Sequence, residues 1–140
     1  MKRLSFVPVS LVVCLASCSL VSPLPKDEAA AFAKVQAVLE TNCVQCHGKH
    51  HYQEMPAFTS TKSLAGLIGP GKWIVPGKPD QSRFFTVVTF PGEAWGAMPP
   101  TGHSISKQDV SILRAWIKAG AKIPAGNQPL KPRGDLPLAP

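Results

Sequence analysis

The 140-residue sequence has four cysteines and no thiol after Cys46. A zinc knuckle would need a second cysteine or histidine pair at finger-like spacing, and no further thiol supplies one. No β-α-β pattern, in which a thioredoxin-like dithiol is usually found, surrounds the cysteines that are present. The basic residues form neither a block nor a stripe interleaved with aromatic side chains, so nucleic acid is not expected as a partner.

The charge and the length of the chain narrow the partners and the domain organisation to be expected. The chain has 15 lysines and arginines against 8 acidic residues, and its formal net charge of +7 is spread along the sequence. Such a surface suits an acidic protein partner, and a solvated basic surface without a specific partner is an equal alternative. The length suits one small domain. A domain of this size buries only part of its apolar surface and gains stability from a covalent staple.

Two of the cysteines belong to Cys43-Val44-Gln45-Cys46-His47, a C-x-x-C-H motif. This spacing attaches a c-type haem, because two thiols about one helical turn apart can add to the two vinyl groups of one porphyrin. The histidine that follows then lies under the iron and offers an imidazole nitrogen as a ligand. We therefore predict one covalent haem c, with Cys43 and Cys46 as thioethers and His47 on the iron. A local metal site completed by neighbouring histidines is the alternative, although so short a loop holds tetrahedral geometry poorly.

The N-terminus is typical of an exported protein. Lys2 and Arg3 begin it, and the apolar run at 4–16 is too short for a comfortable membrane span. The letters Leu-Ala-Ser-Cys that end at Cys18 resemble the lipobox of bacterial lipoproteins, in which the cysteine is lipidated and becomes the new N-terminus. We expect a lipoprotein signal peptide at 1–17 and a lipidated tether at 18–26.

Lipidation of Cys18 would hold the mature chain at a membrane, on the periplasmic side of a bacterial cell envelope, because several acyl chains anchor a protein stably. Ser19 resembles the sorting choice for the outer membrane. Cleavage would discard Cys14, so that only Cys43 and Cys46 keep free thiols and no structural disulfide is expected. Ordinary cleavage that leaves Cys18 as a spare thiol is the alternative.

Hydrophobic periodicity predicts an amphipathic helix near each end of the domain. The first, at 26–42, has an apolar stripe of Phe32, Val35, Val38 and Leu39. The last, at 106–120, has an apolar stripe of Val110, Leu113, Trp116 and Ile117. Ser106 stands at capping-box spacing from Asp109, which favours a helix start there.

Shorter helices are expected between these two, as a turn at 63–68 and a helix at 81–89 capped by Asp80. From Pro124 to the last residue the chain is rich in proline and is predicted to be a disordered tail. The folded domain is therefore expected at 27–123 and the tail at 124–140.

Gly96-Ala97-Met98-Pro99-Pro100 contains a second candidate iron ligand. The two prolines have fixed φ angles and cannot extend a helix, so they hold this loop stiffly. A thioether is a known partner of histidine in haem ligation, and we predict Met98 as the second axial ligand. His103 is the competing ligand, and Met55 ranks below Met98.

Two supporting roles are left open by the sequence. Arg83 and Lys78 are candidate partners for a haem propionate, because charge-assisted donors suit a carboxylate. The sequence does not decide which backbone carbonyl orients the His47 imidazole, and the candidates are those of Pro56, Pro70 and Pro76.

The motifs together resemble the small c-type cytochrome domain called planctomycete-type. Besides the haem motif, the resemblance rests on Val75-Pro76-Gly77-Lys78-Pro79-Asp80-Gln81-Ser82, on Met98-Pro99-Pro100-Thr101-Gly102, and on Ser106 through Trp116-Ile117-Lys118-Ala119-Gly120-Ala121. It covers residues 30–123. It implies an all-α, class I cytochrome c fold with three to four helices around one haem, and iron ligation by His47 and Met98. The run Gly48-Lys49-His50-His51 departs from the pattern, and the family's domain is commonly fused to larger proteins rather than anchored alone.

Iron ligated from both sides has no vacant position for a substrate, so the resemblance implies electron transfer rather than catalysis. The expected function is that of a membrane-tethered periplasmic electron carrier. Its partners would be redox proteins such as an exported dehydrogenase, an oxidase or a reductase. The alternatives are a haem enzyme or a gas or redox sensor with an open distal site, and a haem subunit of a larger oxidoreductase complex.

Overall fold

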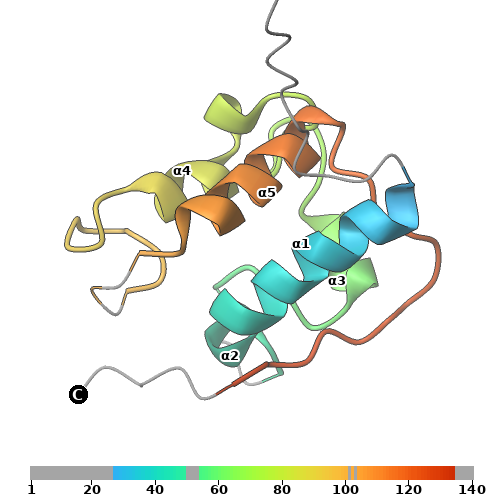
Figure 1. The fold of residues 1–140 in the computed structure, drawn as a ribbon, viewed down its shortest axis with the longest axis horizontal. Coiled ribbons are helices and arrows are strands. Elements are labelled where there is room, and N and C mark those ends of the chain that lie inside the picture. The colour runs from blue at the N-terminus through green and yellow to red at the C-terminus, as the bar shows by residue number, and fades with distance from the viewer. Residues whose placement is uncertain (1–26, 50–53, 101, 103, 135–140) are drawn as a thin grey trace, which may run out of the picture.

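The structure is a computed structural model that describes residues 27–49, 54–100, 102 and 104–134. In these ranges the chain forms five α-helices, one short 3₁₀-helix and no β-strand, in agreement with the expected all-α class (Figure 1). The elements are α1 (Glu28–Asn42), α2 (Val44–His47), α3 (Thr61–Gly66), η1 (Pro79–Gln81), α4 (Arg83–Thr89) and α5 (Lys107–Lys118). None of the helices in the described ranges is long and apolar enough to cross a membrane. The expected signal peptide, Cys18 and the tether lie outside the described residues.

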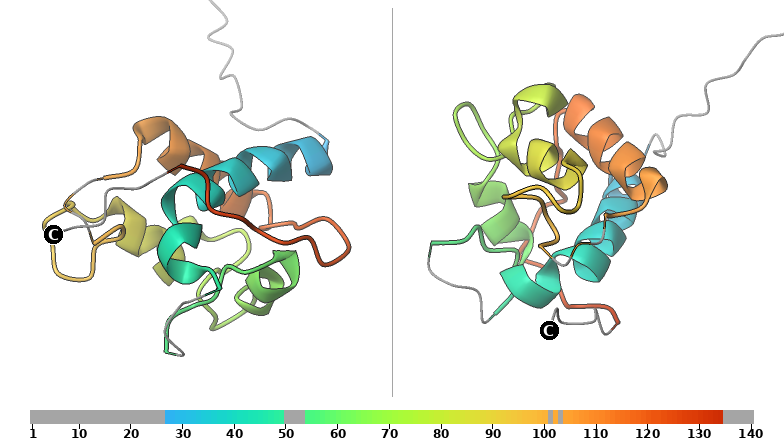
Figure 2. Two further views of the ribbon diagram at one scale, coloured as in Figure 1. Left: turned by 90° about the horizontal axis from the view of Figure 1, so that it is seen from below. Right: turned by 90° about the vertical axis from the view of Figure 1, so that its left-hand side faces the viewer.

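Helix α1 packs as its sequence predicts, and it begins at Glu28 rather than at the predicted residue 26. The Asp27 side chain caps it by accepting a hydrogen bond from the Ala29 amide at 3.1 Å, which satisfies one of the free donors of the first turn. The whole predicted apolar stripe is buried, and it consists of Phe32, Val35, Val38 and Leu39. This face packs against α5, so the first and last helices of the domain share one core (Figures 1 and 2).

Helix α5 differs from its prediction by a small rotation. Ser106 caps it as expected, accepting a hydrogen bond from the Asp109 amide at 3.0 Å. Its buried face consists of Ile112, Leu113, Trp116 and Ile117. Val110, which was expected in the stripe, is only partly buried, and Ile112 takes its place. The sequence alone does not distinguish the two, because both lie within a helical turn of Leu113.

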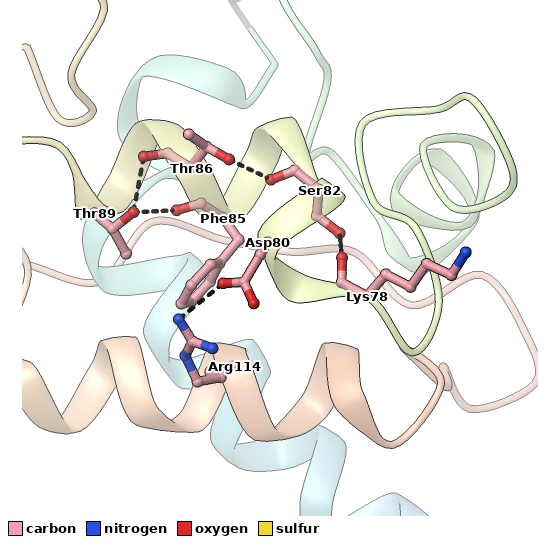
Figure 3. A network of polar contacts seen from close by, with 7 residues as sticks. All are labelled: Lys78, Asp80, Ser82, Phe85, Thr86, Thr89 and Arg114. Atoms are coloured by element: carbon pink, nitrogen blue, oxygen red, sulfur yellow. Dashed lines mark hydrogen bonds and ion pairs between the residues drawn. The ribbon is translucent and has the colours of Figure 1, made fainter.

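The expected cap of α4 is wrong. Asp80 lies within η1 rather than before α4, and its carboxylate pairs with the Arg114 guanidinium of α5 at 3.0 Å (Figure 3). The N-cap of α4 is Ser82, whose hydroxyl donates to the Lys78 carbonyl at 2.9 Å and so holds the preceding turn closed. Pro79 starts the 3₁₀ turn because its fixed φ suits the first turn of a helix.

Helices α4 and α5 are further linked through Arg114. Its guanidinium lies over the Phe85 ring, 4.7 Å from the ring centre, while it pairs with Asp80 (Figure 3). Both members of the ion pair are largely exposed, so the pair itself adds little stability and the stacked contact positions the helices.

The expectation of a disordered tail from residue 124 is wrong for residues 124–134. This segment, the strap, runs back along the domain beneath α1 and beside α3 as the red trace of Figure 1. It forms an isolated antiparallel bridge in which Pro129 pairs with Ser60. Leu130 is 5% exposed and belongs to the hydrophobic core. A proline-rich composition excludes regular helix but leaves the backbone able to bond to another segment.

A carboxylate buried in the last turn of α1 joins this helix to the strap. Glu40 is 4% exposed, and it accepts hydrogen bonds from Gln36 Nε2 at 2.8 Å, the Lys131 amide at 3.2 Å and Arg133 Nε at 2.5 Å. Burial alone would raise the pKa of Glu40. The hydrogen bonds from Gln36 and Lys131, together with the Arg133 guanidinium, outweigh burial and hold this pKa below its usual value.

The lowered pKa predicts an acid-dependent part of the stability. Because the folded state binds the Glu40 proton less tightly than the unfolded state, this stabilisation is complete above the unfolded-state pKa and is lost as the pH falls through the lowered one. We expect Glu40→Gln to reduce the free energy of unfolding by about 1–2 kcal/mol at neutral pH. The difference from the unmodified protein should shrink towards zero in acid, as measured by urea titrations across a pH series.

The exposed carboxylate Glu93 offers a matched control for that series. Glu93→Gln should stay within about 0.5 kcal/mol of the unmodified protein. A Glu40→Gln deficit that is the same at every pH would contradict the assignment.

Candidate cofactor pocket

A cavity of about 390 Å³ is lined by residues of α2 and α4 and of the segments around them. Its walls come from the end of α1, from α2, from the segment that follows residue 54, from α4 and from the loop that ends at residue 105. It is lined by Asn42, Cys43, Gln45, Cys46, His47, Glu54, Met55, Pro56, Phe58, Trp73, Arg83, Phe84, Val87, Val88, Trp95, Gly96, Met98, Pro99, Pro100 and Ile105. All four residues that the sequence predicts as cofactor ligands belong to this one lining.

The two thiols reach the pocket because the motif is helical. Cys43 ends α1, with its amide bonded to the Leu39 carbonyl at 2.8 Å, and then begins a further turn. In that turn the amides of Cys46 and His47 donate to the Cys43 carbonyl at 3.2 Å and 2.9 Å. Cys43 and Cys46 are therefore one turn apart on the same side of the chain, and both are free thiols.

Gly48 ends this turn, directly after His47, at a place where no side chain fits. A Cβ atom at position 48 would stand 2.4 Å from the Val44 carbonyl oxygen. The chain can therefore leave the motif at this angle only through glycine. This close approach gives the first residue of the unusual Gly-Lys-His-His run a structural role, whereas His50 and His51 lie outside the described residues.

A backbone carbonyl holds the imidazole of His47 through its Nδ1 atom. Its Nδ1 donates to the Pro56 carbonyl oxygen at 2.8 Å, because a carbonyl can only accept. Of the three prolines left open by the sequence, Pro56 is the one that orients the ring. A proton fixed on Nδ1 makes Nε2 the ring nitrogen whose lone pair suits a metal. His47 is 8% exposed, so this tautomer is set inside the fold.

Phe58 completes the support of His47, and sequence analysis did not identify it. Its amide donates to the His47 carbonyl at 2.7 Å, and its ring lies 5.1 Å from the imidazole, centre to centre. On its other side the ring meets Phe84 of α4 edge-on at 5.8 Å. No local pattern marks this residue, because its contacts depend on how the chain folds back after α2.

Met98 approaches the pocket from a loop whose backbone is tied to α4. Its amide donates to the Val87 carbonyl at 2.9 Å, and the next residue along the lining is Pro99. The loop is closed at its base, where the Gly102 carbonyl oxygen lies 3.0 Å from the point that a Cβ of Gly92 would occupy. The thioether is thus presented by a short closed loop, as the two prolines suggested. Met55 also lines the pocket, and His103 lies outside the described residues.

Of the two basic residues expected near a carboxylate of the cofactor, only Arg83 lines the pocket. Its guanidinium stacks on the Trp73 ring at 4.7 Å, which holds the planar group at the wall. Lys78 instead belongs to a second depression with Asp80 and Arg114, in the region drawn in Figure 3. The structure thereby separates two residues that were both candidates from the sequence, with Lys78 already the less favoured.

Burial of its thiol raises the pKa of Cys43 to about 12. The Asp109 carboxylate and Cys46 nearby raise it further, because each disfavours a second negative charge. Cys43 as a residue is half-exposed, whereas Cys46 is exposed. A thiol with so high a pKa has little thiolate at neutral pH and is therefore a poor nucleophile on its own.

The chemistry of the pocket lining suits an apolar group that is bound through sulfur and an imidazole nitrogen. The lining is dominated by aromatic, aliphatic and proline side chains, together with two thiols, the oriented imidazole of His47 and the thioethers of Met55 and Met98. These are the groups that hold a covalent c-type haem.

Nowhere in the described residues, the pocket included, do three histidine, cysteine or acidic side chains form a group that could hold a metal ion. Comparisons with known proteins add no relative. No family model, curated protein or solved structure matches the chain.

The Phe58 contacts predict a large loss of stability on truncation. Phe58 is 3% exposed between two other rings, and Phe58→Ala should lower the free energy of unfolding by about 3–5 kcal/mol in urea titrations. Phe90 is the matched control, because it is 39% exposed and outside the core. Phe90→Ala should cost less than about 1 kcal/mol, and equal losses for the two variants would contradict this packing.

Proposed function

We propose that this protein is a mono-haem c-type cytochrome that transfers electrons. The observation that supports this most strongly is that Cys43, Cys46, His47 and Met98 line one apolar pocket. Met98 is far from the motif in the sequence, and nothing local requires the two to meet. The helical architecture, with α1 leading into the motif and packing on α5, is compatible with the class I cytochrome c fold.

The residues present would hold the haem from both faces and at its edge. The Cys43 and Cys46 thiols would form thioethers with the two vinyl groups, and His47 Nε2 and Met98 Sδ would be the axial ligands. The haem would supply an iron that changes between Fe(III) and Fe(II). With both axial positions taken by the chain, no position is left for a substrate, so the function is electron transfer rather than catalysis.

The chain's own contribution is to orient the ligands and set the surroundings of the iron. The Pro56 carbonyl fixes the tautomer and the orientation of His47 and raises its basicity. The aromatic and aliphatic walls keep the pocket apolar, which affects the reduction potential. Arg83, held on Trp73, is the residue best placed to bond to a carboxylate at the edge of the group.

The proposed location and partners rest on the sequence. An acylated Cys18 would tether the domain to a bacterial membrane on its periplasmic side, most simply the outer membrane. The redox partners would be exported proteins such as a dehydrogenase, an oxidase or a reductase. Trp95, whose side chain is 100% exposed, stands at the rim of the pocket, where such a partner would meet the protein.

Covalent attachment is the first test. The chain should be expressed in full with a haem-attachment system and denatured, and then extracted with acidified solvent. We expect the colour to stay with the polypeptide, because thioether bonds survive denaturation. Mass spectrometry of the mature chain should show one haem together with acyl groups on Cys18. Colour that leaves with the solvent would rule out the proposal.

The axial ligand is tested by the spectrum of the oxidised protein. We expect a far-red sulfur-to-iron absorption band in the unmodified protein and its loss in Met98→Ala, with the haem still attached in both. Met55→Ala is the matched control, since Met55 lines the same pocket and should leave the band unchanged. A high-spin spectrum in the unmodified protein would instead indicate an enzyme or sensor with an open site. Purification at fixed stoichiometry with other proteins would indicate a subunit of a complex.

A further inference from the structure

We propose that the strap, residues 124–134, is a positioning element that holds the Pro56–Phe58 segment in place and, through it, the imidazole of His47. Its two anchor residues are Thr61 and Glu40. The part of the inference that concerns the iron rests on the function proposed above. The structural part does not, because it concerns contacts within the polypeptide.

The first anchor joins the strap to the chain that follows Phe58. The Leu130 amide donates to the Thr59 carbonyl at 3.0 Å, and the Thr61 amide donates to the Gln128 carbonyl at 2.9 Å. The Thr61 side chain adds two more bonds, donating to the Gly126 carbonyl at 3.0 Å and accepting from the Gln128 amide at 2.9 Å. Thr61 is 1% exposed, so these bonds are shielded from water.

The second anchor joins the strap to the end of α1. The Glu40 carboxylate accepts from the Lys131 amide and from Arg133, and the Arg133 amide donates to the Glu40 carbonyl at 2.8 Å. The side-chain contacts of Glu40 with Lys131 and Arg133 join residues that are 91 and 93 positions apart in the sequence. Glu40 nevertheless lies within one helical turn of Cys43. A charged group so deeply buried must keep its partners, because an unpaired one would carry a large desolvation cost.

The two anchors lie on either side of the haem motif. Glu40 is one helical turn before Cys43, and Thr59 directly follows Phe58, whose amide and ring hold His47. The strap therefore spans from the element that leads into the motif to the segment that supports its histidine. No strap residue lines the pocket, so the strap acts on His47 only through Thr59–Thr61 and the Pro56–Phe58 segment.

Local structure alone does not explain this support. The capping box of α3 ties Ser60 to Ser63, and the Thr59 amide bonds to the Ser63 hydroxyl at 3.0 Å. Those bonds fix the start of a helix of only 6 residues. Helices this short are not stable by themselves and depend on tertiary contacts. The strap provides such contacts at Thr61, the first residue of α3.

Hydrogen exchange at the Phe58 amide tests the structural part. Thr61→Val removes the side-chain bonds of the first anchor, and Glu40→Gln weakens the second. In each variant we expect the protection of the Phe58 amide to fall by about tenfold to a hundredfold. Protection of the Leu113 amide, in the α1–α5 core, should fall only by the loss of global stability that urea titration measures for the same variant, and therefore by less than the protection at Phe58. Thr86→Val is the matched control, because the Thr86 hydroxyl bonds only within α4 in the contacts described and should leave both amides protected (Figure 3).

The part of the inference that concerns the iron is tested by measuring the reduction potential, both in the point variants and in a shortened chain. A chain that ends at Ala125 lacks residues 126–134 of the strap, whereas one that ends at Gly134 keeps the whole strap and is the control. In the haem-loaded Thr61→Val, Glu40→Gln and Ala125-ended proteins we expect a higher reduction potential with the haem still attached. A loosened Nδ1–H bond makes His47 a less basic ligand and favours Fe(II).

The outcomes separate the two proposals. Equal losses of protection at Phe58 and Leu113, with an unchanged potential, would overturn the inference and leave the strap a general stabiliser. If the chain that ends at Ala125 does not fold, the two point variants decide the question. If the unmodified protein carries no covalent haem, the proposed function fails, and hydrogen exchange at Phe58 still decides the positioning role of the strap.

Discussion

The hydrogen bond from His47 Nδ1 to the Pro56 carbonyl is the interaction on which the arrangement of the pocket depends. An imidazole has two nitrogens, and only when one of them is held by a fixed acceptor does the other have a defined direction and protonation state. The carbonyl must come from a segment that folds back onto α2, and Phe58 supplies the further bond and ring contact that keep it there. The walls of the pocket and the Met98 loop are then built around a ring that is already oriented.

The hydrophobic core of the described chain extends from the α1–α5 interface to the wall of the pocket. The α1–α5 core is closed by large aliphatic and aromatic side chains, and it is capped at both helix starts by side chains that the sequence makes evident. Between α2 and α4 the same core borders the apolar pocket, and Phe58, Phe84 and Val88 belong to both. Under the proposed function, a covalently attached haem would pack against these side chains, so that the cofactor and the fold would stabilise each other.

Where the sequence-based expectations were wrong, a long-range partner had replaced a local one. Asp80 has the composition of a helix cap, but Arg114 of α5 lies within reach of its carboxylate and Ser82 takes the cap position. The proline-rich segment after residue 124 has too little regular pattern for an element, yet Leu130 finds a place in the core. The burial of Glu40, for which no sequence pattern provided a specific expectation, likewise depends on the strap. In each of these cases the deciding contact joins residues far apart in the chain, and no local pattern records it.

The sequence by itself determined the two terminal helices, the apolar face of α1, most of the apolar face of α5, and the residue types of the candidate site. These depend on spacing along the chain, namely the helical period of the apolar residues and the single turn between Cys43 and Cys46. Only the tertiary structure decided that Pro56 rather than Pro70 or Pro76 orients His47, that Arg83 rather than Lys78 lines the pocket, and that the last segment packs back on α1. Such choices depend on which distant segments the packed core brings within hydrogen-bond distance, and spacing along the chain does not contain that information.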